Sequence, residues 1–282
     1  MLRVIVSPAK KMRAGVESPM PLTTPALAGR SAELLEALLG MDGSELQALW
    51  KVSDRLLGPC LDTLEALREV GLPASGDDLA RPGAGALVSP AALAYHGIQY
   101  QSMAPEVMSA GELAWVGEHL RILSGLYGCL RPFDAVVPYR LEMGARLPPG
   151  HSWPGGARDL YAFWGDGLAR EVCAQEGDMA DGGAPVHVVN LASVEYAKAV
   201  LPRLGSDVRM TTCVFAEGLR GGKPVQRSTA SKAARGSMVR WLAARGADVP
   251  AELEGFDVGY RYAPELSSGE GTARRTLVFV RP

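Results

Sequence analysis

Closely spaced metal ligands are missing from this 282-residue chain. Its four cysteines lie about 40 to 70 residues apart without a C-x-x-C pair, and its four histidines form neither an H-x-x-x-H nor an H-E-x-x-H pair. Cysteines in this arrangement are predicted to be reduced, mostly buried small hydrophobic residues. We therefore expect no metal and no cofactor, while a metal site assembled from distant residues stays open.

Long hydrophobic runs are missing as well, since no run approaches the roughly 20 apolar residues that a membrane helix needs. The N-terminal stretch MLRVIVSPAKKM contains only five residues that could serve as an apolar run, which is too short for a signal peptide. The hydrophobic content of 47% and the charged content of 21% are those of a globular protein. We expect a cytoplasmic monomer without membrane contact.

The chain also lacks the sequence motifs of common nucleotide-binding and hydrolase sites. It has no P-loop, no G-x-S-x-G and no G-x-G-x-x-G after a predicted strand. Function must therefore be sought in the distribution of charge and at the ends of the predicted strands.

Positive charge is concentrated in one segment of the chain. Residues 198–245 contain ten Lys and Arg against two acidic residues, a formal charge of +8. The remainder carries −10, because the whole chain has a net charge of −2. Such a basic segment suggests a surface for phosphate-bearing partners. The alternative, which stays open, is that the basic segment pairs with the acidic remainder of the same chain.

Strand and helix patterns alternate along the chain without repeats or a clear linker. This predicts a single compact domain over residues 1–282 of the α/β class, in the mixed α+β form. Strands are expected at 2–6, 186–190, 208–215 and 276–280. Helices are expected at 31–39, 44–57, 62–70, 111–120, 158–173, 193–201 and 229–245, with a short further helix at 250–254. The aromatic run 93–103 fits either a strand or the wall of a pocket.

The helix at 229–245 contains a glycine at position 236. Glycine inside a helix costs about 1 kcal/mol relative to alanine. We expect Gly236 to allow the close approach of another backbone.

The segment 119–144, HLRILSGLYGCLRPFDAVVPYRLEMG, combines an apolar run with several charges that are expensive to bury without a partner. One interpretation is a buried structural segment whose arginines are held by Asp134 and Glu142. The other is a ligand pocket in which some of the arginines face an anion. The residues alone favour neither.

Polar residues also gather where two predicted strands end. Ser7 and Lys10 follow the first strand, and Asn190 and Ser193 follow the strand 186–190. Open sheets commonly bind ligands at the carboxyl ends of their strands. The sequence therefore predicts an anion-binding site at this edge.

These clusters lie within stretches that resemble the YaaA peroxide-stress protein family. The stretches are SPAKKM (7–12), KVSDRL (51–56), AYHGIQYQSMAP (94–105), the segment 119–144, RDLYAFWGD (158–166), NLASVEYAK (190–198), KAARGSMVRWL (232–242) and LEGFDVGYRYAPELSSGEG (253–271). They follow the family order over nearly the whole chain.

The resemblance implies a compact mixed α/β fold with a positively charged cleft that binds DNA. It also implies a helix-hairpin-helix-like element near the C-terminus, which would span residues 229–254 here. Such elements hold the duplex backbone through main-chain amides and basic side chains. Double-stranded DNA, bound through its phosphates, is thus one expected partner. The family is associated with survival of hydrogen peroxide through lower free iron.

The alternative partner, which the polar residues suggest rather than the resemblance, is a small anionic or nucleotide-like ligand, bound by an enzyme that could serve a biosynthetic pathway. A non-specific DNA binder needs positive charge, whereas the matching stretches also specify Asn, Glu and buried Arg. Direct iron handling is disfavoured, because no ligand cluster is spaced for it.

The candidate residues fall into two groups. The catalytic candidates are Lys10, Arg140, Glu142, Glu195 and Lys198, with Glu142 or Glu195 as general base. The candidates for binding the ligand or DNA are Ser7, Lys10, Arg121, Arg131, Asn190, Ser193, Lys232, Arg235 and Gly236. One cleft is expected, lined by Lys10, Arg121, Arg140, Asn190, Lys198, Lys232 and Arg235, with Arg140 facing it and contacting no protein carboxylate.

Overall fold

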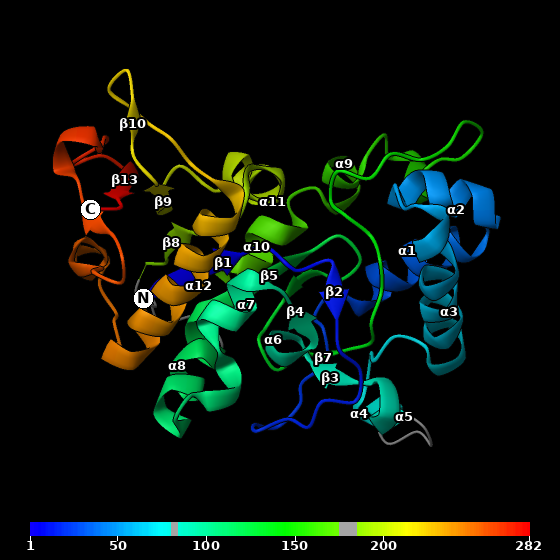
Figure 1. Ribbon diagram of the computed structural model, residues 1–282. Helices are drawn as coiled ribbons and strands as arrows, with labels where there is room; N and C mark the ends of the chain where they lie inside the picture. Colours follow the sequence, from blue (N-terminus) through cyan, green and yellow to red (C-terminus); the bar gives the residue numbers. More distant parts are fainter. Residues whose placement is uncertain (80–83, 175–184) are drawn as a thin grey trace.

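A seven-stranded sheet forms the centre of the computed structural model, which describes residues 1–79, 84–174 and 185–282 (Figure 1). The strand order is β12-β13-β9-β8-β1-β5-β6. The inner strands run parallel, and β12 and β6 are antiparallel edge strands. The strands are β1 (Leu2–Val6), β5 (Leu120–Ser124), β6 (Gly128–Leu130), β8 (His187–Asn190), β9 (Arg209–Ala216), β12 (Arg261–Tyr262) and β13 (Arg274–Val280).

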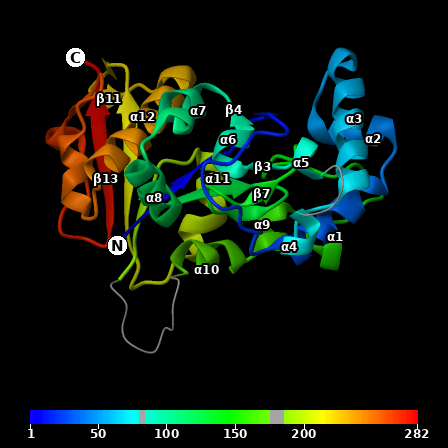
Figure 2. The ribbon, with the colours of Figure 1, turned by 90° about the horizontal axis from the view of Figure 1, so that it is seen from below.

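Helices cover both faces of this sheet. Figure 2 shows α7 and α12 on one side and α10 on the other. Both views place α1, α2 and α3 together at the end of the molecule away from β13. The helices are α1 (Ala28–Leu39), α2 (Gly43–Trp50), α3 (Asp54–Val70), α4 (Gly76–Leu79), α5 (Ala84–Leu87), α6 (Ala91–Ala94), α7 (Ile98–Met103), α8 (Ala110–His119), α9 (Leu160–Trp164), α10 (Gly167–Cys173), α11 (Val194–Val200) and α12 (Ser228–Arg245).

Short elements connect these layers. Three two-stranded sheets pair β2 (Lys11–Met12) with β4 (Tyr95–His96), β3 (Ser89–Pro90) with β7 (Ala135–Val136), and β10 (Leu219–Arg220) with β11 (Lys223–Pro224). The 3₁₀ helices are η1 (Pro105–Val107), η2 (Pro154–Gly156), η4 (Leu201–Arg203), η5 (Pro250–Gly255) and η6 (Pro264–Leu266). None of the helices within the described ranges has both the length and the apolar character to cross a membrane.

The order of the sheet reverses at β1. The chain passes from β1 to β5 on one side and later returns to β8 on the other side. Both pairs are parallel, so the segments that follow β1 and β8 leave the same edge of the sheet. Ligands of parallel sheets bind outside the carboxyl ends of strands at such a reversal. The topology therefore places a binding site next to Ser7 and Leu191.

All four strands expected from the sequence are confirmed, as β1, β8, β9 and β13, with bounds within two residues of the predicted ones. Runs of apolar residues mark them because parallel strands are covered on both faces. The mixed α/β class is confirmed too.

Some helix bounds were wrong. The helix expected at 44–57 ends at Trp50 as α2, because the chain turns at Lys51, whose φ of 51° is left-handed. No glycine marks that turn in the sequence. The helix expected at 62–70 begins earlier, since α3 starts at Asp54 and runs through Pro59. The helix expected at 158–173 is two helices separated at Gly165. The run 93–103 is mainly helical, with only the two-residue strand β4 between α6 and α7. Its other interpretation, a pocket wall, agrees with the cavity described below.

The expected helix-hairpin-helix element is not confirmed. Its first helix is present as α12, which ends at Gly246 in the left-handed conformation. The second is the 3₁₀ helix η5, which begins at Pro250. A proline lacks the main-chain N–H with which a hairpin of this kind binds phosphate.

Helix α12 packs unusually closely on α7. A Cβ atom on Gly236 would lie 1.9 Å from the carbonyl oxygen of Gln99 and 3.0 Å from the main-chain nitrogen of Met103. Only glycine fits this contact between two backbones, as the sequence predicted for Gly236. The contact fixes α12, and with it Arg235, against the segment that follows β4.

Candidate functional site

A cavity of about 590 Å³ opens at the carboxyl ends of β1 and β8. Its walls are the segment after β1, the start of α7, the segment 139–142, the start of α11 and one face of α12. We call it the switch-point cavity. Its lining residues are Ser7, Pro8, Ala9, Lys10, Lys11, His96, Gly97, Ile98, Gln99, Tyr100, Tyr139, Arg140, Leu141, Glu142, Ser193, Glu195, Tyr196, Ser228, Lys232 and Arg235.

Ser7 ties the walls of this cavity together. Its hydroxyl accepts a hydrogen bond from the main-chain N–H of Ser193 at 2.8 Å, and the two hydroxyls lie 3.1 Å apart. Its carbonyl oxygen accepts from the side chains of Gln99 and Tyr100, both at 3.0 Å. The ends of β1 and β8 and the start of α7 are therefore held by one residue.

Tyr139 lines the cavity, and its hydroxyl belongs to a buried hydrogen-bond network behind the lining residues. The hydroxyl of Tyr139 lies 2.6 Å from that of Ser124 and 2.9 Å from that of Tyr95. Burial raises the pKa of Tyr139 to about 12 and that of Tyr95 well above its usual value. These phenols stay protonated at neutral pH, so they contribute hydrogen bonds and ring surface without charge.

Arg140 and Arg235 contribute the unpartnered positive charge. Neither guanidinium forms a hydrogen bond or an ion pair with any residue that the structure describes, and the Nε atom of each is buried. Burial lowers the pKa of Arg235, and the buried thiol of Cys213 opposes this to a smaller extent. A buried cation without a partner is costly unless a ligand supplies the counter-charge. Arg140 thus has the geometry predicted from the sequence, and its role in binding stays a prediction.

The two carboxylates of the cavity differ in their contacts. Glu195 accepts a hydrogen bond from the main-chain N–H of Gly144 at 2.7 Å and so holds the segment 139–144. Glu142 forms an ion pair with Lys10, in which Oε1 and Nζ are 2.5 Å apart. The Lys10 side chain is 67% exposed, so this pair can open readily. Glu142 therefore fits the expected general base better than Glu195 does.

Five expected site residues lie outside the cavity lining. Gly236, expected to bind the ligand or DNA, packs against the backbone of α7 instead. Arg121 donates hydrogen bonds to the carbonyl oxygens of Gly117, Glu118 and Leu120, at the amino end of β5. It forms no ion pair with Asp134 or Glu142, so the interpretation in which these two residues hold the arginines of the segment is wrong for Arg121. Its position also corrects the expectation of a single cleft that includes it.

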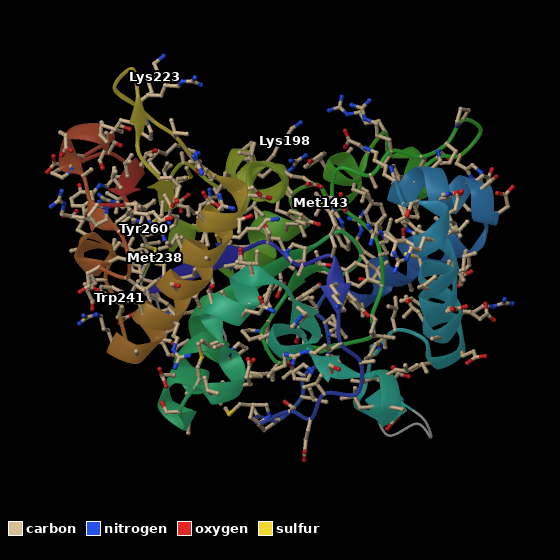
Figure 3. The ribbon with its side chains drawn as sticks, in the orientation of Figure 1. Met143, Lys198, Lys223, Met238, Trp241 and Tyr260 are labelled. Carbon is tan, nitrogen blue, oxygen red and sulfur yellow. The ribbon has the colours of Figure 1, made fainter. Side chains whose placement is uncertain are left out.

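The other three have structural contacts of their own. The main-chain N–H of Arg131 donates to Asp134 at 2.7 Å. Asn190 accepts from the main-chain N–H of Ala192 and donates to Thr212, which fixes the turn after β8. Lys198 lies over the ring of Tyr161, 4.8 Å from its centre, and points outward from α11 in Figure 3. Asn190 and Lys198, expected to line the cleft, do not.

Sequence reasoning missed several lining residues, among them Tyr139, Tyr196 and Ser228. Ser228 begins α12, one turn before Lys232, so the spacing of one helical turn could have identified it. The tyrosines carried no such signal, because a buried tyrosine with a satisfied hydroxyl is an ordinary core residue. Among the described residues, no three His, Cys, Asp or Glu side chains gather in a group that could hold a metal ion.

Comparison with known proteins gives one consistent result. The pattern of the family described as "Peroxide stress protein YaaA" matches residues 2–266. A UPF0246 protein of Pediococcus pentosaceus is 40% identical over 281 residues, covering 99% of this chain and 98% of that protein. UPF0246 proteins of Lactiplantibacillus plantarum (39% identical, 91% of each chain) and Limosilactobacillus fermentum (40% identical, 95% of this chain and 96% of that protein) are similar as well. The chain belongs to the YaaA family of peroxide stress proteins.

Proposed function

We propose that this protein binds a phosphate-bearing ligand in the switch-point cavity, as its part in the response to peroxide stress. The observation that carries the proposal is the pair of guanidinium groups, Arg140 and Arg235, that face the cavity without a protein partner. Guanidinium groups bind phosphate oxygens with two parallel hydrogen bonds. Lys232 and the hydroxyl of Ser228 on the same wall add further donors.

The size of the cavity favours a small ligand. Its volume of about 590 Å³ falls within the roughly 300–1,000 Å³ of typical small-molecule sites. Apolar and aromatic groups such as Ile98, Tyr100 and Leu141 make up much of the wall beside the cations. A molecule of nucleotide size, with a phosphate and an uncharged body, matches this lining.

Binding of duplex DNA is the second candidate, and the basic segment 198–245 favours it. The hairpin β10–β11 within this segment carries the exposed Arg220 and Lys223, and Figure 3 shows Lys223 at its projecting tip. Phosphate contacts of this kind give non-specific affinity. A duplex would lie over the rim of the cavity, since the cavity itself is too small to hold one.

An enzymatic role on the same small ligand is compatible with the cavity, with Glu142 as the proton acceptor. The geometry gives less support to direct iron binding, because the described residues hold no cluster of metal ligands. Any effect on free iron would then be indirect, through the bound ligand.

Calorimetric titration with inorganic phosphate and adenosine monophosphate tests the proposal. We expect binding by the full chain and at least a tenfold loss of affinity in Arg140→Met, because a hydrogen bond to a charged group contributes about 1.5–3 kcal/mol. Arg240→Met is the matched control, since Arg240 has the same intermediate exposure as Arg140 but lies on α12 and does not line the cavity. Equal binding by both variants, or no binding by the unmodified chain, would contradict the proposal.

A further inference from the structure

The charges that line the switch-point cavity are distributed unequally over its walls. The α12 wall carries two cations, Lys232 and Arg235, and no carboxylate. The segments after β1 and before Gly144 carry three cations, Lys10, Lys11 and Arg140, but also Glu142. A ligand with two different ends would therefore meet two different electrostatic environments.

Of the two carboxylates in the lining, Glu142 is the one that accepts no hydrogen bond from the main chain. Glu195 is occupied by the main-chain N–H of Gly144, and a Cβ atom at position 144 would lie only 3.1 Å from its Oε1 atom. The side chain of Glu142 has a single partner among the described residues, the exposed Lys10. Ion pairs of exposed lysines are weak, because both side chains lose conformational freedom and solvent screens the attraction. A ligand group can therefore replace Lys10 at Glu142.

From this asymmetry we infer that Glu142 determines which phosphate compounds the cavity accepts. The inference rests on the proposed function. The phosphate lies against Arg235, Lys232 and Arg140, and the other end of the ligand meets Glu142. A hydroxyl or amino group at that end donates a hydrogen bond to the carboxylate. A second carboxylate or phosphate at that end is repelled by it, and this repulsion acts through a partly desolvated site where screening is reduced.

The predicted ligands are thus phosphate monoesters of alcohols, sugars or amines, and doubly anionic esters are rejected. Specificity of this kind depends on an unfavourable interaction with the wrong ligand as much as on a favourable one with the right ligand. Glu142 supplies both in one side chain.

A matched pair of small probes tests the inference without knowledge of the natural ligand. Glycerol 3-phosphate and 3-phosphoglycerate differ only in a terminal hydroxymethyl group that is a carboxylate in the second compound. Affinities of both, and of inorganic phosphate, are measured by calorimetry for the full chain, for Glu142→Gln and for Glu254→Gln. Glu254 is the control, because its ion pair with Arg275 lies outside the cavity and its side chain is 39% exposed, close to the 35% of Glu142.

We expect the unmodified chain and Glu254→Gln to bind glycerol 3-phosphate at least tenfold more tightly than 3-phosphoglycerate. Glu142→Gln should lower this ratio at least tenfold, chiefly by tighter binding of 3-phosphoglycerate, while binding of inorganic phosphate persists. An unchanged ratio in Glu142→Gln, with inorganic phosphate still bound, would overturn the inference and leave the proposed function intact. Failure of all three compounds to bind to the unmodified chain would instead overturn both.

Discussion

The arginines at the two ends of the central sheet differ in their hydrogen-bond partners. At the amino end, Arg3 donates hydrogen bonds to the carbonyl oxygens of Glu118 and Ala174, and Arg121 donates to the carbonyl oxygens around the end of α8. At the carboxyl end, Arg140 and Arg235 have no partner among the described residues and face a cavity. Main-chain carbonyls at a helix C-terminus carry partial negative charge, so they can satisfy a buried cation without a carboxylate.

The difference separates arginines that serve folding from arginines that are available to a ligand. Arg3 is only 2% exposed and burial lowers its pKa to about 10, yet its hydrogen bonds keep it in place. Arg235 keeps intermediate exposure, and its buried Nε atom has no such compensation. The two kinds of arginine therefore differ in exposure and, more directly, in whether main-chain oxygens accept their hydrogen bonds.

The largest expected effect comes from the contact that shapes the carboxyl end. Gly236→Ala would place a methyl group against the main-chain carbonyl of Gln99, which cannot move without displacing α7. We expect the free energy of unfolding to fall by about 3 kcal/mol or more. Denaturant unfolding measures this, with Gly246→Ala, whose Cβ meets open space at a φ of 61°, as the comparison for a change that strains only the backbone. A Gly236→Ala protein as stable as the unmodified chain would show that α12 is free to shift.

A matched pair of substitutions tests the comparison between the two ends directly. Arg3→Met should lower the free energy of unfolding by about 2–3 kcal/mol, because two buried carbonyl oxygens lose their donor, and it should leave phosphate binding unchanged. Arg235→Met should do the reverse, since it removes a buried charge without a partner: stability is kept and phosphate affinity falls at least tenfold. Thermal unfolding and calorimetry of both variants measure these effects. If both variants lost stability alone, the carboxyl-end arginine would be structural too.

The same residues show which features of the fold and the site could be predicted from the sequence. The parallel strands could be predicted because their apolar runs are continuous. The close contact at Gly236 could be predicted because a glycine is costly inside a helix. The structural role of Arg121 could not be predicted, since its hydrogen-bond acceptors are main-chain carbonyls, which every residue possesses. The hydrogen bond between Ser7 and Tyr100 could not be predicted either, because 93 residues separate them in the sequence. Local pattern identified the elements, and long-range contacts decided which charges share a cavity.

A smaller effect is expected from the pH dependence of stability at the amino end. His187 begins β8, and burial together with Arg209, Arg275 and the N-terminus lowers its pKa from 6.5 to about 4. The unfolded chain therefore binds a proton at this residue before the folded chain does, so stability falls as the pH drops from about 6.5 to about 4. Because the ring keeps some exposure, we expect a loss of about 1–2 kcal/mol from this residue.

The variant His187→Gln can keep a hydrogen bond to Thr211 without titrating. Its free energy of unfolding, measured by urea titration from pH 7 to pH 4, should depend less on pH than that of the unmodified chain. Parallel curves for the two proteins would mean that His187 is solvated and titrates normally.

The smallest expected effect concerns the binding of duplex DNA. It distinguishes binding in the cavity from binding to the basic surface around it. Binding of DNA to exposed cations releases counterions, so the logarithm of the affinity falls with the logarithm of the salt concentration by about 0.9 per neutralised phosphate. Arg220 and Lys223 are exposed on the projecting hairpin, whereas Arg235 lies within the cavity wall. We expect the double variant Arg220→Ala, Lys223→Ala to reduce the magnitude of this slope by about 2, and Arg235→Met to leave it unchanged. Fluorescence anisotropy with a labelled duplex at several salt concentrations measures both. A slope that responds to Arg235 but not to the hairpin would place the phosphates of DNA inside the cavity, and the distinction between a small-ligand site and a DNA-binding rim would then fail.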